Sequence, residues 1–397
     1  MRRRGQRGRI LGVVASVASL AVIAASNGAS VADAAVPAVR SVLGPGTLDS
    51  PGALATDSAG DVFVADTGHC RVLIVAAHSG HSYGGAVSAG HARTIAGGHC
   101  GDASIGHPTG LAVDVTGDVY VAEANEQRIQ VIEPSGIIAL VAGSGKAGDS
   151  GDGGMATSGR LDEPTGVAVD RSGDLFIADT ANCKIRVVPE ADGEILGQPV
   201  ERDHLYTIAG TGVCGSAGQG GPLATAQLFD PVAVAVDFAG DLLVADRGDQ
   251  SVLLATEHSG TYYGTAVGAG DIGVVVGGTG SYGSYVADGL SATSVGAELN
   301  DPRGIALGPT GALVLSDGFM HVIRVVPAQS ATQFGRVMAA GDLYTVAGAL
   351  PVKTAAGSGD GTRWVLTRMG IPTGIAVTTG GAVVFCDEAT GAVMRVG

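Results

Sequence analysis

A proline precedes an acidic residue by fifteen positions at six places along the chain. This constant spacing indicates six copies of one structural unit. A glycine also stands nine residues after each proline, between two short apolar runs. The chain is therefore expected to fold by repetition rather than as several unrelated domains. The six pairs are Pro51/Asp66, Pro108/Glu123, Pro164/Asp179, Pro231/Asp246, Pro302/Asp317 and Pro372/Asp387.

Each repeat predicts four antiparallel strands. Its first two apolar runs and the turn between them are typical of a β-hairpin, because glycine adopts the positive φ that such turns need. A third run follows the acid, as in Lys184 to Val188, and a fourth closes the unit, as in Thr207 to Gly210. Four such strands, repeated around an axis, describe a β-propeller blade. The runs are too short for a helical solenoid or a parallel α/β fold.

The last repeat lacks its fourth strand, because the chain ends at Gly397 just after the third run. A stray strand pattern at about residues 39–44 has no repeat of its own ahead of it. We expect this segment to complete the last blade and leave no open sheet edge. The predicted fold is thus all-β, a six-bladed β-propeller closed by its N-terminal strand.

Residues 1–34 are predicted to be a secretory signal peptide, followed by the propeller at residues 35–397. Five arginines precede an apolar stretch from Ile10 to Ala25, and Ala32-Asp33-Ala34 offers small residues for cleavage. A retained membrane anchor stays open as the alternative, although a spanning helix needs about 20 apolar residues. We expect a secreted protein, extracellular or in the cell envelope, with no stable membrane span after cleavage.

The composition argues against a nucleic-acid partner. The whole chain has 23 basic and 38 acidic side chains of Lys, Arg, Asp and Glu. Removing residues 1–34 takes away five arginines and one aspartate, which leaves 18 basic and 37 acidic side chains and a net charge of 18 − 37 = −19. So acidic a surface repels phosphate backbones.

Four of the five cysteines are predicted to form disulfides. Cys70 and Cys183 stand four residues after the acid, at the start of the third strand. Cys100 and Cys214 follow the fourth strand of the same repeats. Because the start of the third strand lies beside the end of the fourth, the pairs Cys70/Cys100 and Cys183/Cys214 are geometrically matched. Disulfides are typical of exported proteins, and Cys386 is interpreted as a small buried hydrophobe.

Several segments resemble the NHL-repeat β-propellers, of the secreted bacterial type. They are residues 207–212 (Thr-Ile-Ala-Gly-Thr-Gly), 151–157 (Gly-Asp-Gly-Gly-Met-Ala-Thr) and 164–170 (Pro-Thr-Gly-Val-Ala-Val-Asp). The resemblance extends over about residues 39–397. It implies the propeller architecture but no single activity, because the family includes extracellular sensors, scaffold modules, RNA binders and a metal-dependent amidating lyase.

The repeated acids and the histidines do not form a clear catalytic pattern. The six repeated acids could ring a calcium ion, but we interpret them as acceptors of backbone N–H groups in turns. Histidines 69, 99, 107 and 321 are expected on one face and 78, 81, 91 and 258 on the other. Only His69 and His99 are expected to lie close together, beside the first disulfide, and zinc needs about three convergent ligands. We therefore assign no catalytic or metal-binding residue.

The sequence favours a non-catalytic binding or scaffold module, expected to be monomeric, for a protein, peptide or cell-envelope glycan. The loops between blades are its expected binding face, and the related insertions at residues 78–84 and 258–264 are expected to be packed hairpins. The alternative is a lyase or lactone hydrolase that uses a divalent cation, calcium or zinc, at the central channel. No cofactor is expected for the favoured function.

Overall fold

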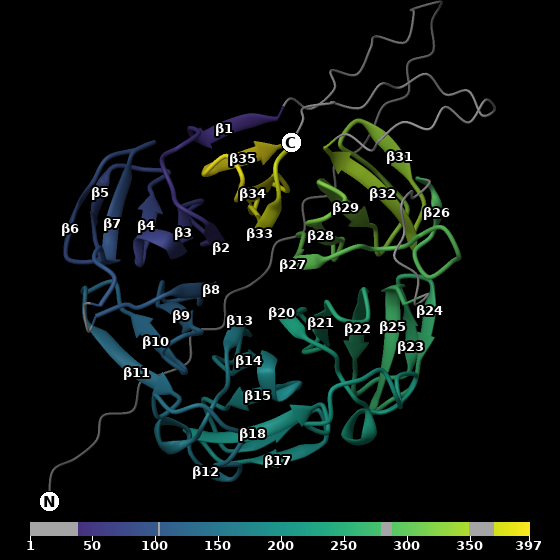
Figure 1. Cartoon of the computed structure of the whole chain (residues 1–397). Helices are drawn as coiled ribbons and strands as arrows, with labels where there is room; N and C mark the ends of the chain where they lie inside the picture. Colours follow the sequence, from purple (N-terminus) through teal and green to yellow (C-terminus); the bar gives the residue numbers. More distant parts are fainter. Residues whose placement is uncertain (1–38, 102–103, 279–287, 349–368) are drawn as a thin grey trace, which may run out of the picture. The chain divides into compact units, whose positions relative to one another are not determined.

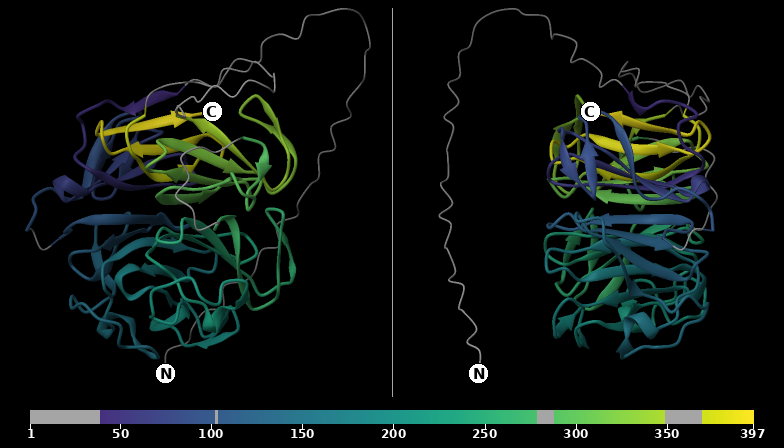
Figure 2. Two further views of the ribbon diagram at one scale, coloured as in Figure 1. Left: turned by 45° about the vertical axis from the view of Figure 1, so that its right-hand side comes forward. Right: turned by 90° about the vertical axis from the view of Figure 1, so that its left-hand side faces the viewer.

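The computed structural model describes residues 39–101, 104–278, 288–348 and 369–397. These residues form six antiparallel sheets around a common centre, and the first strand of each sheet lies nearest to it (Figure 1). Figure 2 shows the same ring from two other sides. The predicted six-bladed β-propeller is thereby confirmed. The predicted signal peptide lies outside the described residues, and no helix within them is long and apolar enough to cross a membrane.

The blades follow one another in chain order. Blade 1 contains β2 (Pro51–Thr56), β3 (Val62–Asp66), β4 (Arg71–Val75) and β7 (Ala92–Gly97). Blade 2 contains β8 (Pro108–Val113), β9 (Val119–Glu123), β10 (Arg128–Ile132) and β11 (Ile138–Ala142). Blade 3 contains β13 (Pro164–Val169), β14 (Leu175–Asp179), β15 (Lys184–Val188) and β18 (His204–Ala209).

The second half of the ring repeats this order. Blade 4 contains β20 (Pro231–Val236), β21 (Leu242–Asp246), β22 (Ser251–Ala255) and β25 (Asp271–Gly277). Blade 5 contains β27 (Pro302–Leu307), β28 (Leu313–Asp317), β29 (Val322–Val326) and β32 (Asp342–Ala347). Blade 6 contains β33 (Pro372–Val377), β34 (Val383–Asp387), β35 (Ala392–Val396) and β1 (Arg40–Leu43).

The two ends of the chain close the ring within blade 6. Strand β1 pairs antiparallel with β35, and Arg40 stands opposite Arg395. This is the closure that the stray N-terminal strand predicts. It covers the outer edge of β35, which would otherwise present unpaired backbone groups.

Blades 3, 4 and 5 have a fifth strand that the sequence reasoning missed. The loop entering each of these blades adds a two-residue strand beside the fourth strand, as where Gly154 pairs with Leu205. These glycine-rich segments lack the length and alternation that mark a strand in a sequence. They are β12 (Gly154–Met155), β19 (Gly221–Pro222) and β26 (Leu290–Ser291). The described residues also contain four 3₁₀ turns, η1 (Thr67–His69), η2 (Ala156–Ser158), η3 (Thr180–Asn182) and η4 (Leu223–Thr225).

Hairpins extend blades 1, 3, 4 and 5 on the face opposite the loops between blades. The two predicted insertions are packed hairpins, and the structure adds two more. Each reaches the next blade: the Tyr83 hydroxyl donates to Gly117 O at 2.7 Å and the Tyr263 hydroxyl to Gly311 O at 2.9 Å. The hairpins are β5/β6 (Gly80–Ser82, Gly85–Val87), β16/β17 (Gly193–Ile195, Gln198–Val200), β23/β24 (Gly260–Tyr262, Thr265–Val267) and β30/β31 (Ala331–Gln333, Arg336–Met338).

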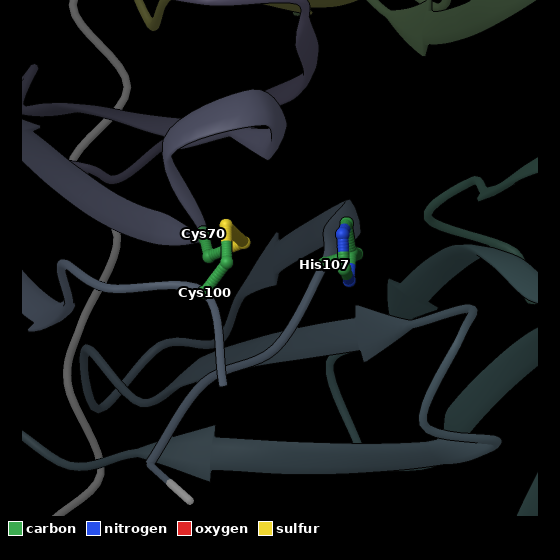
Figure 3. A group of neighbouring side chains, drawn as sticks. All are labelled: Cys70, Cys100 and His107. Carbon is green, nitrogen blue, oxygen red and sulfur yellow. A yellow bond between two sulfur atoms is a disulfide. The ribbon is translucent and has the colours of Figure 1, made fainter. Parts of the chain in front are cut away.

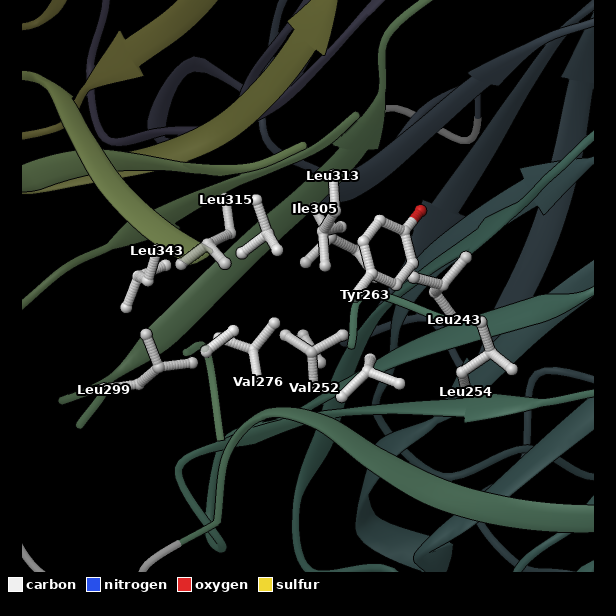
Figure 4. Close-up of a cluster of buried hydrophobic side chains, with 14 of the residues drawn as sticks. Leu243, Val252, Leu254, Tyr263, Val276, Leu299, Ile305, Leu313, Leu315 and Leu343 are labelled. Carbon is white, nitrogen blue, oxygen red and sulfur yellow. The ribbon is translucent and has the colours of Figure 1, made fainter. Parts of the chain in front are cut away.

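The hydrophobic core is divided among the boundaries between blades. The buried residues form six clusters, and each cluster joins two neighbouring blades. Figure 4 shows the cluster between blades 4 and 5, where Leu243 and Val252 face Ile305 and Leu315. Burial of apolar surface stabilises such contacts by about 25 cal/mol per Å². Blade-to-blade packing therefore holds the ring together.

The inner strands approach one another so closely that a side chain is excluded at one repeat position in four of the six blades, whereas Ala53 and Ala233 occupy that position in blades 1 and 4. A Cβ atom built on Gly110 would lie 2.4 Å from Thr165 O, and one on Gly374 would lie 2.4 Å from Ala53 Cα. Real Cβ atoms do not approach backbone atoms this closely. Glycine at this position therefore lets the first strands of adjacent blades meet around a narrow centre.

The six repeated acids fix the entry into each blade. Each carboxylate accepts the N–H of the residue two positions before its own proline, at 2.6–3.0 Å. The sequence interpretation placed these bonds in the turn after the acid. The structure shows such a bond in blades 5 and 6, from Met320 and Thr390, while the bond to the preceding segment is present in all six blades. The repeated acid thus anchors the loop that arrives from the previous blade.

Candidate functional site

Hydroxyl groups link neighbouring blades near one end of the channel. Thr67 Oγ1 of blade 1 donates to Pro108 O at 2.6 Å, and Thr373 Oγ1 of blade 6 donates to Pro51 O at 2.6 Å. Similar bonds from Thr109, Thr165 and Ser316 join blade 2 to 3, 3 to 4 and 5 to 6. Among the described residues, only the boundary between blades 4 and 5 lacks a threonine or serine bond of this kind at the channel; its hydroxyl bond, from Tyr263 to Gly311 O, lies on the opposite face.

Two arginines lie at this exceptional boundary. Arg247 occupies the position that holds Thr67 in blade 1 and Thr180 in blade 3, directly after the repeated acid. Arg303 occupies the position directly after the proline of blade 5. Both line a cavity of about 270 Å³ at the channel mouth, to which all six blades contribute residues. We call this cavity the charged mouth.

The charges of this mouth are arranged as ion pairs. Arg247 Nε lies 2.7 Å from Asp230 Oδ2. Arg303 bridges Asp301, with Nε 2.6 Å from Oδ2, and Glu388, with Nη1 2.8 Å from Oε2. The terminal nitrogens of Arg247 have no hydrogen-bond partner within the described ranges. They remain available as donors, because a guanidinium offers five N–H groups.

Below the mouth the channel narrows. The inner strands enclose a space of about 70 Å³, lined by backbone and by small residues such as Gly110, Gly166 and Ala233. A ligand group larger than a few atoms does not fit this constriction. The charged mouth is therefore the part of the channel that is open to a ligand.

Aromatic side chains are exposed on the same face of the same two blades. Phe229 directly precedes Asp230, and 47% of its surface is accessible. Phe319 follows β28 in blade 5 and is 68% accessible. Both come from segments at the end of the ring where the inner strands begin. Exposed aromatic groups near convergent polar groups are typical of binding surfaces.

Buried carboxyl groups also differ between blades. The Asp246 carboxyl of blade 4 is buried beside Asp249 and Asp230, and burial followed by these like charges raises its pKa to about 8. Asp66, at the same repeat position in blade 1, instead receives Arg71 Nε at 2.7 Å. Asp246 is therefore a protonated acid at neutral pH, but it has no exposed surface.

Both predicted disulfides are present. Cys70 bonds to Cys100 and Cys183 bonds to Cys214, within blades 1 and 3 respectively. Besides His69 and His99, which directly precede Cys70 and Cys100, His107 of blade 2 brings a ring nitrogen within 4.8 Å of both sulfur atoms of the first disulfide, which the sequence reasoning did not predict (Figure 3). His69 Nδ1 lies 2.9 Å from Asp66 Oδ2. Cys386 is buried and free, and burial raises the pKa of its thiol.

The sequence reasoning missed the three charged residues of the mouth. Their signal is a departure from the repeat: the residue after the acid is Thr67 and Thr180 in blades 1 and 3 but Arg247 and Glu388 in blades 4 and 6. A comparison of the repeats at that position would have singled out Arg247 and Glu388, and a comparison at the position after the proline would have singled out Arg303. Repeats that build one shape vary where a particular surface is needed.

Fold and site together define a β-propeller with a ligand-sized cavity at its channel mouth. The NHL repeat model matches residues 106–132 and 161–188, which include the first three strands of blades 2 and 3. The chain is thus a six-bladed β-propeller in which blades 2 and 3 match the NHL repeat.

Three known proteins are similar to this chain, one in sequence and two in fold. Teneurin-4 from Homo sapiens is 36% identical over 99 residues, which is 22% of this chain and 4% of that protein. An auxiliary nutrient binding protein from Bacteroides thetaiotaomicron has a TM-score of 0.57 at 10% identity, over 90% of this chain and 76% of that one. A gluconolactonase from Xanthomonas campestris has a TM-score of 0.52 at 12% identity, over 91% and 89%. At such identities these two structures share the fold alone.

Proposed function

We propose that this protein is a secreted, non-catalytic binding module that holds a hydroxyl-rich ligand, such as a cell-envelope glycan, at the charged mouth. The observation that supports this most is the placement of Arg247 and Arg303. They stand at the one described blade boundary without a threonine or serine hydroxyl bond around the channel, and they line a cavity of about 270 Å³. Secretion is supported by the N-terminal sequence and by two disulfides.

The pairing of charges favours a ligand that both donates and accepts hydrogen bonds. A simple anion at the mouth would meet the carboxylates of Asp230 and Glu388 as well as the guanidinium groups. A simple cation would meet Arg247 and Arg303. A hydroxyl group donates to a carboxylate and accepts from a guanidinium, so it satisfies both. Sugars present many such groups without a net charge.

Exposed Phe229 and Phe319 complement this polar chemistry. Small-molecule sites usually combine apolar and aromatic surface with a few polar groups that fix orientation. One structure of similar fold is an auxiliary nutrient binding protein, and another is a gluconolactonase. Both names are compatible with a small polar ligand.

The alternative function, a metal-dependent lyase or lactone hydrolase, requires about three convergent ligands for its cation. The described lining of the mouth includes one carboxylate, Glu388, and no histidine. This donor set does not match a catalytic zinc centre. The binding function therefore has the better support from the side chains.

The test is an array of cell-surface glycans probed with the full-length protein. We expect Arg247→Gln or Arg303→Gln to weaken binding about tenfold or more, because a hydrogen bond from a charged group contributes about 1.5–3 kcal/mol. Arg202→Gln is the matched control, since Arg202 also pairs with a glutamate, Glu190, but lies in a hairpin segment on the opposite face.

Two results would contradict the proposal. One is an equal loss of glycan binding in the Arg202→Gln control. The other is turnover of glucono-lactone by the purified protein that ends when Arg303 is replaced, which would favour the hydrolase.

A further inference from the structure

The first disulfide has a third potential metal ligand beside it. The sulfur atoms of Cys70 and Cys100 and a ring nitrogen of His107 all lie within 4.8 Å of one another (Figure 3). This is the single group of three such residues among those that the structure describes. The two cysteines belong to blade 1, whereas His107 directly precedes the first strand of blade 2. The group therefore spans a blade boundary.

Thiolate and imidazole are the ligands that zinc prefers. Zn–S bonds are about 2.3 Å long and Zn–N bonds about 2.0–2.1 Å, so two sulfur atoms on one tetrahedral zinc stand about 3.7 Å apart. After reduction the two sulfur atoms are no longer joined and can move apart to this distance. Cys100 follows a glycine-rich turn on the surface, which gives that side chain room to move.

The histidine already has the support that metal-binding histidines usually have. His107 Nδ1 lies 3.4 Å from Glu126 Oε1, and the backbone N–H of His107 donates to Glu126 Oε2 at 3.0 Å. A carboxylate on one ring nitrogen fixes the tautomer and leaves the other nitrogen free to bind a metal. Glu126 thus orients Nε2 as a ligand.

A reductant can reach this bond from one side. Cys100 is exposed, whereas Cys70 is fully buried at the start of β4. A thiolate attacking Cys100 Sγ would therefore release Cys70 first. His107, with 40% of its side chain accessible, stands next to both sulfur atoms.

The second disulfide offers a natural control. Cys183 and Cys214 occupy the same repeat positions in blade 3. The residue that corresponds to His107 in the following blade is Asp230, whose carboxylate pairs with Arg247 at 2.7 Å. The described residues place no third ligand beside this pair. Reduction there yields two thiols without a histidine.

We propose that reduction of the Cys70–Cys100 disulfide turns this corner into a zinc site, with both sulfur atoms and His107 Nε2 as ligands and a water molecule as the fourth. A dithiol supplies two electrons and two protons, is oxidised to a cyclic disulfide, and leaves two cysteine thiols. Zn²⁺ then displaces the two thiol protons and binds both thiolates and the neutral imidazole. The bond within blade 1 is thereby exchanged for a clip between blades 1 and 2.

The experiment uses the full-length protein, reduced with dithiothreitol and desalted without oxygen. Zn²⁺ is titrated against a chromophoric chelator, and Co²⁺ replaces it to report thiolate ligation by its charge-transfer absorption. We expect one tight site per reduced chain and none in the oxidised protein. The double variant Cys183→Ser/Cys214→Ser should keep that site.

Two variants separate this site from adventitious binding by free thiols. His107→Gln should weaken zinc binding at least tenfold while both thiols remain. Glu126→Gln should weaken it about tenfold or more without changing the cobalt spectrum, because it acts through His107.

The proposal fails if reduced wild-type protein and His107→Gln bind zinc equally. It also fails if loss of Cys183 and Cys214 abolishes the uptake, or if circular dichroism shows that reduction unfolds the ring before zinc is added.

Discussion

Replacing Asp246 with asparagine should stabilise the protein at alkaline pH, although the same change at Asp66 should destabilise it. Both acids are buried at one repeat position and accept one backbone N–H, at 2.8 Å and 2.7 Å. Asp66 also receives Arg71 Nε at 2.7 Å. Asp246 meets Asp249 and Asp230 instead, and burial together with these charges raises its pKa to about 8.

Whether stability rises or falls with pH depends on which state, folded or unfolded, holds the Asp246 proton. The folded protein keeps the Asp246 proton up to about pH 8, whereas the unfolded chain releases it near the ordinary value of 3.8. Between these values the folded state binds more protons, so the free energy of unfolding falls as pH rises. A difference of about four pKa units corresponds to at most about 6 kcal/mol.

Asparagine does not titrate, so it removes this pH dependence of stability. Its side-chain oxygen can still accept the Phe229 N–H. We expect Asp246→Asn to match the wild type within about 1 kcal/mol near pH 4 and to exceed it by several kcal/mol near pH 8.5. Asp66→Asn should lose about 1–3 kcal/mol at pH 8.5, because its bond with Arg71 is charge-assisted. Urea unfolding followed by circular dichroism at both pH values measures these differences. The reasoning is refuted if the gap between wild type and Asp246→Asn does not widen with pH.

Three further predictions concern stability and use the same unfolding assay. Arg186→Met should lower the free energy of unfolding by about 3–5 kcal/mol, because it leaves Asp179 buried without its cation at 3.0 Å. Arg324→Met should cost clearly less, since Nε and Nη2 of Arg324 have no hydrogen-bond partner among the described residues; equal losses would contradict this. The double change Cys183→Ser/Cys214→Ser should lower the free energy of unfolding by about 3–4 kcal/mol, as expected for a separation of 31 residues, and an unchanged value would show that the bond stabilises nothing. Tyr263→Phe should cost about 1 kcal/mol by removing the 2.9 Å bond to blade 5, and a loss of zero would mean that the hairpin does not hold that blade.

The repeat made most of the architecture predictable. A fixed distance from proline to acid defines the length of the first hairpin in every blade, and the strand at about 39–44 could only complete the last one. The disulfides followed from the same logic, because repeat position alone placed Cys70 beside Cys100. The strands β12, β19 and β26 escaped prediction, since a two-residue strand has no periodicity to detect.

The candidate site was less predictable, because it depends on contacts between blades. Nothing in the sequence shows that Arg247 and Arg303, fifty-six residues apart by number (303 − 247), share one cavity. The proximity of His107 to the first disulfide was missed for the same reason, because His107 comes from the next blade and stands beside neither cysteine in sequence. The repeat predicts the strands of each blade, but it does not predict which side chains of different blades come into contact.

The pairing of β1 with β35 also governs when the protein can finish folding. Arg40 and Arg395, which face each other, are separated by almost the whole chain, so this contact pays a large loop-closure entropy. During synthesis β1 emerges before the other strands and has no partner until β35 has left the ribosome. The first five blades can form as the chain grows, but the sixth must wait. A chain truncated before Ala392 therefore has five whole blades and a strand β1 without its partner.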